Sequence, residues 1–89
     1  MKETWIVICY TSEGGIGVAK MFGTREEVQE KLFSFIKKDR DEDKDGWYSG
    51  TESVYDFDSF SNGFCGYNNF EQYSINYAAY VYNDLPRWR

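Results

Sequence analysis

The first quarter of the chain carries two runs of apolar side chains separated by a Gly-Gly pair. Residues 4–11, TWIVICYT, are β-branched or aromatic at most positions, and both alternating faces are apolar. The two faces are Trp5, Val7 and Cys9, and Ile6, Ile8 and Tyr10. A strand with this pattern is typical of the centre of a sheet. The second run, 16–22, follows SEGG, and two strand patterns separated by Gly-Gly predict a tight hairpin turn.

A helical pattern follows over residues 24–39. Thr24 precedes the apolar repeat and Glu27 stands three residues later, which is a capping box. The apolar positions then recur at i, i+4, i+7 and i+8, as one helix face requires. They are Val28, Leu32, Phe35 and Ile36.

The second half is less regular. Residues 51–60 alternate aromatic and acidic side chains and predict a half-solvated strand, residues 61–69 are rich in turn formers, and residues 70–83 predict a long antiparallel strand. The order β-β-α-β-β predicts one α+β domain over residues 1–89. It would have two layers, an antiparallel sheet of about four strands with one helix packed on one face.

Aromatic residues are abundant, at 20% of the chain. One helix covers one face of a sheet, so part of this surplus is expected on the open face, where a partner or a second copy could bind. The aromatic residues expected in the core are Trp5, Phe33, Phe35, Tyr55 and Phe57. Those expected at the surface are Trp47, Tyr48, Tyr67, Tyr80 and Tyr82.

Charge is distributed unevenly along the chain. The formal net charge is −5, yet residues 39–58 alone hold eight carboxylates against Arg40 and Lys44. This concentration disfavours nucleic-acid backbones and anionic membranes as direct partners, and it favours cations or a basic protein.

Residues 41–52, DEDKDGWYSGTE, have the spacing of a helix–loop–helix calcium loop. Carboxylates stand at positions 1, 3 and 5, glycine at 6 and glutamate at 12. The candidate ligands are Asp41, Asp43, Asp45, Trp47 through its carbonyl, Ser49 and Glu52. Against this interpretation, position 8 is aromatic, no second loop is present, and a strand pattern follows. The alternative is a solvated acidic connection.

Catalytic interpretations find little support. The chain has no histidine, which removes the commonest general base and metal ligand. Asp56 and Asp58 share a strand face without a predicted pocket, and SEGGIG lacks the lysine of a phosphate loop. We therefore expect a non-enzyme without a cofactor, calcium excepted. The N-terminus resembles a strand more than a signal peptide, and no apolar run could span a membrane, so we expect a cytoplasmic location.

Three stretches together, FGTREEVQEKL, GTESV and QYSINYAAY, resemble small bacterial accessory proteins of mobile elements such as plasmids, phages and conjugative elements. That group has no assigned activity, so the resemblance implies no catalytic residues.

The sequence thus predicts a non-catalytic interaction or regulatory protein whose acidic segment, residues 39–58, contacts a basic protein partner. Homodimerisation through the open sheet face is a further expectation. The alternative function is a calcium-binding module. The candidate interaction residues are Trp47, Tyr48, Asp56, Asp58, Tyr80 and Tyr82.

Overall fold

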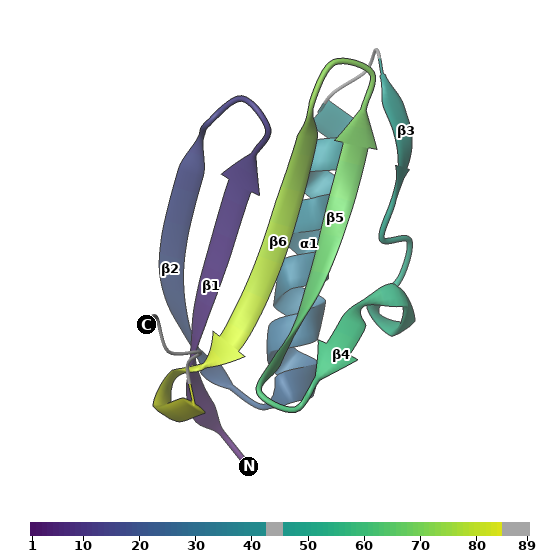
Figure 1. The fold of residues 1–89 in the computed structure, drawn as a ribbon. Helices are drawn as coiled ribbons and strands as arrows, with labels where there is room; N and C mark the ends of the chain where they lie inside the picture. The colour runs from purple at the N-terminus through teal and green to yellow at the C-terminus, as the bar shows by residue number, and fades with distance from the viewer. Residues whose placement is uncertain (43–45, 85–89) are drawn as a thin grey trace.

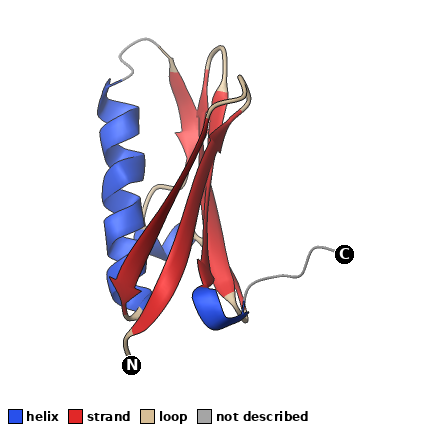
Figure 2. Cartoon of the chain, turned by 90° about the vertical axis from the view of Figure 1, so that its left-hand side faces the viewer, coloured by secondary structure: helices blue, strands red, loops and turns tan. Residues whose placement is uncertain are grey.

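The structure is a computed structural model that describes residues 1–42 and 46–84. Over these residues the chain forms a six-stranded antiparallel sheet and one α-helix that lies along one face of the sheet (Figures 1 and 2). The strands are β1 (Glu3–Thr11), β2 (Ile16–Gly23), β3 (Trp47–Gly50), β4 (Asp58–Phe60), β5 (Gly63–Phe70) and β6 (Ser74–Val81). The helix is α1 (Arg25–Glu42), and two 3₁₀ turns are η1 (Val54–Asp56) and η2 (Tyr82–Asp84).

The strand order is β2-β1-β6-β5-β3, and β4 also pairs with β5. The predicted fold class is therefore confirmed, and β1 lies inside the sheet as its two apolar faces predicted. The expected number of about four strands is an undercount. Residues 51–60 do not form one strand, because η1 interrupts them and only Asp58–Phe60 pairs with β5. Residues 61–69, predicted to be turns, contain most of β5 instead.

The glycines that suggested turns in this region are required by packing. A Cβ atom on Gly63 would lie 2.1 Å from the carbonyl oxygen of Ala79 on the neighbouring strand. A Cβ atom on Gly66 would lie 2.7 Å from Thr51 Oγ1 and 2.8 Å from the Phe57 ring. β5 is therefore a strand whose glycines admit close neighbours on both sides.

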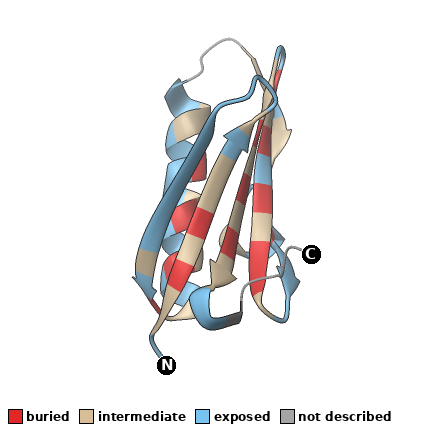
Figure 3. Cartoon of the chain, turned by 60° about the vertical axis from the view of Figure 1, so that its left-hand side comes forward, coloured by how far each residue is buried: buried red, intermediate tan, exposed pale blue. Residues whose placement is uncertain are grey.

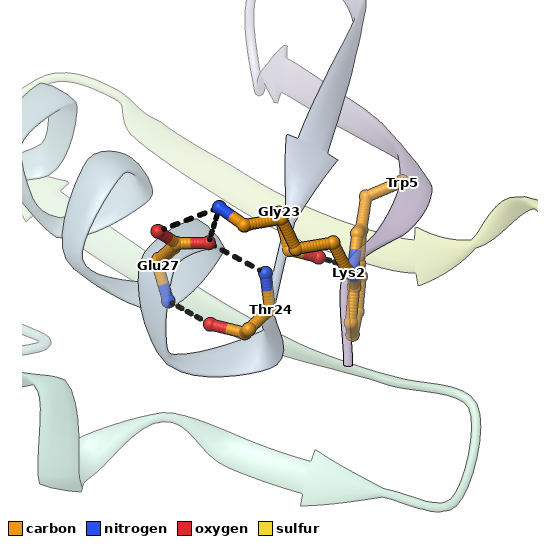
Figure 4. Close-up of polar contacts among 5 residues, drawn as sticks. All are labelled: Lys2, Trp5, Gly23, Thr24 and Glu27. Carbon is orange, nitrogen blue, oxygen red and sulfur yellow. Dashed lines mark hydrogen bonds and ion pairs between the residues drawn. The ribbon is translucent and has the colours of Figure 1, made fainter.

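The predicted capping box is present at the start of α1 (Figure 4). The backbone N–H of Thr24 donates to Glu27 Oε1 at 2.9 Å, and the N–H of Glu27 donates to Thr24 Oγ1 at 3.1 Å. Lys2 forms an ion pair with Glu27 at 3.1 Å, and the Trp5 indole donates to the carbonyl of Gly23 at 3.3 Å. These contacts join the helix start to β1 and β2. At its other end the helix continues to Glu42, three residues beyond the predicted end.

The core lies between α1 and the sheet. Its largest side chains include Trp5, Phe64 and Phe57, and Phe64 packs with ring centroids 5.7 Å from Trp5 and 4.9 Å from Phe57. Two of the aromatic residues expected in the core are exposed: Tyr55, on η1, at 91%, and Phe35, on the rim of the helix stripe, at 41%. Tyr55 is exposed because η1 breaks the strand that would have turned it inward.

Candidate functional site

The C-terminal half of α1 is joined to the sheet by a buried hydrogen-bond network. Asn68 is fully buried, and its amide donates to the Ile36 carbonyl at 2.9 Å and to Tyr77 Oη at 3.2 Å. Its Oδ1 accepts from the Trp47 indole at 3.0 Å. The Tyr77 hydroxyl in turn donates to Asp39 Oδ2. One asparagine thus links α1, β3 and β6.

Trp47 is held by this network and was wrongly expected at the surface. Its side chain is half-buried, and the Arg40 guanidinium lies over the indole ring, 4.4 Å from the centroid. Arg40 also donates to the carbonyl of Thr51, whose hydroxyl accepts from the N–H of Tyr67 at 3.0 Å. Trp47 therefore positions β3 against the helix, and its neighbour Tyr48 is the aromatic residue of β3 that faces solvent, at 73% exposure.

The six candidate calcium ligands do not all fall within the described part of the chain. Asp41 is exposed in the last turn of α1, Ser49 lies on β3 and accepts from the Asn69 amide at 3.3 Å, and Glu52 is exposed after β3. Asp43 and Asp45 lie outside the described residues. Within residues 1–42 and 46–84, no group of three or more cysteine, aspartate or glutamate side chains could hold a metal ion. The calcium site stays a prediction.

The carboxylates that follow β3 in the acidic segment lie along one margin of the molecule, beside η1 and β4 (Figure 1). Glu52, Asp56 and Asp58 are all exposed there, and Tyr55 stands among them. Ser53 caps η1 by accepting from the N–H of Tyr55 at 3.2 Å, and its hydroxyl donates to Asp56 Oδ2 at 3.3 Å. We call Glu52, Tyr55, Asp56 and Asp58 the acidic edge.

No carboxylate of the acidic edge forms an ion pair in the described structure, and the two nearby arginines, Arg25 and Arg40, donate to the backbone carbonyls of Phe60 and Thr51 instead. Residues 46–60 contain no lysine or arginine. Across the described ranges, the ion pair found within 4.0 Å joins Lys2 to Glu27 and includes no residue of the acidic edge. The negative charge of the edge therefore faces solvent and is available to a cationic partner.

The face of the sheet opposite α1 is not covered by the helix (Figure 2). Tyr80 lies on it and packs on Phe60 with ring centroids 5.6 Å apart, and Tyr82 lies near Lys20, whose ammonium is 5.8 Å from the ring centroid. A shallow pocket of about 240 Å³ lies on β1, β5 and β6, with Tyr80 and Cys65 in its lining. Four of the six predicted interaction residues thus fall into two groups, Asp56 and Asp58 on the acidic edge and Tyr80 and Tyr82 on the open face. The other two, Trp47 and Tyr48, lie on β3.

A groove of about 420 Å³ separates α1 from β2 on the other face of the sheet. Phe35, Lys38 and Glu42 line it from the helix, and Ala19 and Met21 line it from the strand. The helix stripe is narrower than the sheet, so β2 extends beyond the helix and is exposed over most of its length (Figure 3).

The two cysteines are free and half-buried. Burial raises the pKa of Cys9, with a smaller contribution from Asp39. Burial likewise raises the pKa of Cys65, assisted by Asp58. Both thiols are therefore protonated at neutral pH, which is opposite to the activation that a nucleophilic thiolate requires.

Comparison with known proteins finds no matching family model, no matching curated protein and no matching solved structure. In the described ranges, α1 does not have the length and apolar character of a membrane-crossing helix.

The sequence pattern did not reveal which residues of β2 are exposed. Ile16, Val18 and Phe22 are 76%, 65% and 71% exposed, although they belong to the apolar run 16–22. One feature of the sequence could have indicated this exposure. Once the other predicted strands are assigned, no further strand pattern is available to pair with the second side of residues 16–22.

Proposed function

We propose that the chain is a non-catalytic interaction protein that acts in the cytoplasm and binds a basic surface of a partner protein through its acidic edge. The observation that carries the proposal is that Glu52, Asp56 and Asp58 are all exposed within three residues of Tyr55 along the chain, and that Tyr55 is 91% exposed. A tyrosine this exposed supplies the aromatic anchor that protein interfaces favour.

The electrostatic environment supports the same choice of partner. The carboxylates are not paired with cations in the described structure, so a lysine- or arginine-rich surface could pair with them without first displacing a bound lysine or arginine. Exposed charges contribute more to association rate and selectivity than to affinity, and the affinity would come chiefly from burial of Tyr55.

A charge-reversal comparison tests the proposal. A labelled lysine- and arginine-rich peptide should bind the protein in fluorescence anisotropy, and its affinity should fall as salt is raised. The double variant Asp56→Lys/Asp58→Lys should weaken binding by about tenfold or more. The matched control is Glu26→Lys/Glu30→Lys, which makes the same change in net charge at exposed positions of α1.

The comparison separates a site from general acidity. Equal losses in the two double variants would mean that the peptide responds to net charge alone, and the proposal would be wrong. Tyr55→Ala should also weaken binding without altering the salt dependence. Capture of partners from cell lysate, followed by comparison of the wild type with the Asp56→Lys/Asp58→Lys variant, would then identify the proteins that depend on this edge.

The calcium-binding module is the alternative, and the spacing of residues 41–52 is the observation that favours it. Calcium titration followed by amide NMR tests it, with magnesium as the control. Saturable shifts confined to residues 41–52, absent in Asp41→Ala, would support the alternative. Equal and diffuse shifts with both ions would reject it.

A further inference from the structure

β2 is an edge strand, and the direction of its free backbone groups can be derived. The N–H of Thr11 donates to the carbonyl of Gly15 at 2.8 Å, so these two residues form a hydrogen-bonded pair. The register of β1 with β2 is regular from Glu3↔Gly23 to Tyr10↔Ile16, and hydrogen-bonded pairs alternate along an antiparallel ladder. The odd-numbered residues of β2 therefore bond to β1.

The even-numbered residues of β2 consequently direct their N–H and C=O groups away from the sheet. These residues are Ile16, Val18, Lys20 and Phe22. The opposite side of β1 agrees with this assignment, because the N–H of Ser12, an even-numbered residue, donates to the carbonyl of Ser74 in the direction of β6. In the part of the chain that the structure describes, β2 thus presents four donors and four acceptors along the side that no other strand pairs with.

The two edges of the sheet differ in the features that prevent strand pairing. The outer edge beside β5 is made of two short strands, β3 and β4, with an irregular register between Trp47 and Ser49 and with acidic side chains nearby. β2 has eight residues, a regular register, no proline and one charged side chain, Lys20. Long, regular, apolar edges are where chains pair with one another.

We infer that the chain forms a two-fold homodimer in which β2 pairs antiparallel with β2 of a second copy. The partner is a second copy because β2 is complementary to itself in one register. When the two-fold axis passes through Ala19, Ile16 faces Phe22 of the second copy and Val18 faces Lys20 of the second copy. All four outward-facing residues of each strand then form hydrogen-bonded pairs.

The neighbouring registers are less favourable. An axis through Lys20 places two ammonium groups directly opposite each other, which destabilises a strand pair. An axis through Val18 shifts Phe22 opposite Gly14, beyond the start of β2, and leaves it without an apolar partner. In the register centred on Ala19, the helix-facing side also matches, because small Gly17 faces Met21 of the second copy and Ala19 faces itself.

The dimer would join two six-stranded sheets into one sheet of twelve strands, with both helices on the same face. The grooves between α1 and β2 would then adjoin across the axis. The acidic edges lie at the opposite margin of each protomer (Figure 1), so they would stand at the two ends of the joined sheet. This inference is independent of the proposed binding function, because it uses no residue of the acidic edge.

Two opposite charges at one position test both the interface and its register. Val18→Lys would face Lys20 of the second copy, whereas Val18→Glu would form an oppositely charged pair with it. Sedimentation velocity over a concentration series should show a wild-type dimer. Val18→Lys should raise its dissociation constant by about tenfold, because the substitution enters the interface twice, and Val18→Glu should leave it unchanged or lower it. Circular dichroism establishes that both variants are folded.

Each other outcome overturns the inference. A wild-type protein that is monomeric at all concentrations would show that the dimer does not form. Equal weakening of the dimer by both variants would refute the register, because an axis through Val18 or Lys20 would give that result. If neither variant changes the dimer, β2 is not the interface. Tyr67→Glu, a change at a 40%-exposed position of the open face on β5, is the matched control and should have no effect. Dissociation by Tyr67→Glu alone would place the contact on the open face.

Discussion

Replacing Asn68 by alanine should cost this protein a large part of its stability. The substitution removes three hydrogen bonds, two donated by the amide to Ile36 and Tyr77 and one accepted from Trp47. A buried hydrogen bond contributes about 0.5–1.5 kcal/mol net, so three of them contribute about 1.5–4.5 kcal/mol. The Trp47 indole would also keep a donor without a partner, which places the expected loss in the upper part of that range.

The loss is measurable because small domains have little stability to spare. The total free energy of unfolding of such a domain is about 5–15 kcal/mol, and 1 kcal/mol shifts Tm by about 4–8 °C at this size. A loss of about 3–4 kcal/mol in Asn68→Ala should therefore lower Tm by about 12–32 °C. Urea unfolding followed by tryptophan fluorescence, with circular dichroism as a second probe, would measure the free energy directly.

The adjacent asparagine is the matched control. Asn69 has the same chemistry but is half-buried and donates one hydrogen bond, to Ser49 at 3.3 Å. Asn69→Ala should cost no more than about 1 kcal/mol. If Asn68→Ala were as stable as Asn69→Ala, the network would not be what holds β3 to the helix, and the reasoning from burial and hydrogen bonding would be refuted.

Three further predictions concern pH and packing. The pKa of Glu27 is lowered because this carboxylate accepts a backbone hydrogen bond at the helix cap and pairs with Lys2, so its contribution to stability is present above its unfolded pKa and is lost as pH falls through the lower folded pKa. In a plot of the urea midpoint against pH, Glu27→Gln should therefore lose less stability than the wild type at acid pH, and an unchanged acid limb would contradict this. Burial and a hydrogen bond to the carboxylate of Asp39 raise the pKa of Tyr77, so the stability of the wild type should fall as pH rises above the ordinary tyrosine pKa of about 10. The stability of Tyr77→Phe, measured in the same assay, should fall less steeply over this range. Gly63→Ala would force a methyl group against the Ala79 carbonyl and should lower the free energy of unfolding in urea by about 1–3 kcal/mol. The methyl group of Gly17→Ala would meet no atom within 4 Å, so this variant should be within about 0.5 kcal/mol of wild type, and equal effects of the two substitutions would contradict the packing argument.

The sequence by itself determined the features that depend on residues close together along the chain. The capping box of Thr24 and Glu27, the apolar helix stripe and the hairpin between β1 and β2 were all predicted correctly. Each rests on contacts between residues three to eight positions apart or on one tight turn, so the local pattern contains both partners. The negative charge of residues 39–58 is likewise a property of composition alone.

The tertiary structure decided everything that depends on a distant partner. β1 and β2 have similar apolar patterns, yet β1 is central because β6, more than sixty residues later, pairs with its second side. Among the described residues, no strand pairs with the second side of β2. Gly63 lies in a stretch that resembles a turn, but it is required in β5 because the Ala79 carbonyl leaves no room for a Cβ atom. Trp47 resembled a surface anchor until Asn68 accepted its indole hydrogen. In each case the local sequence contains only one of two interacting groups, and the fold determines whether the second group lies beside it.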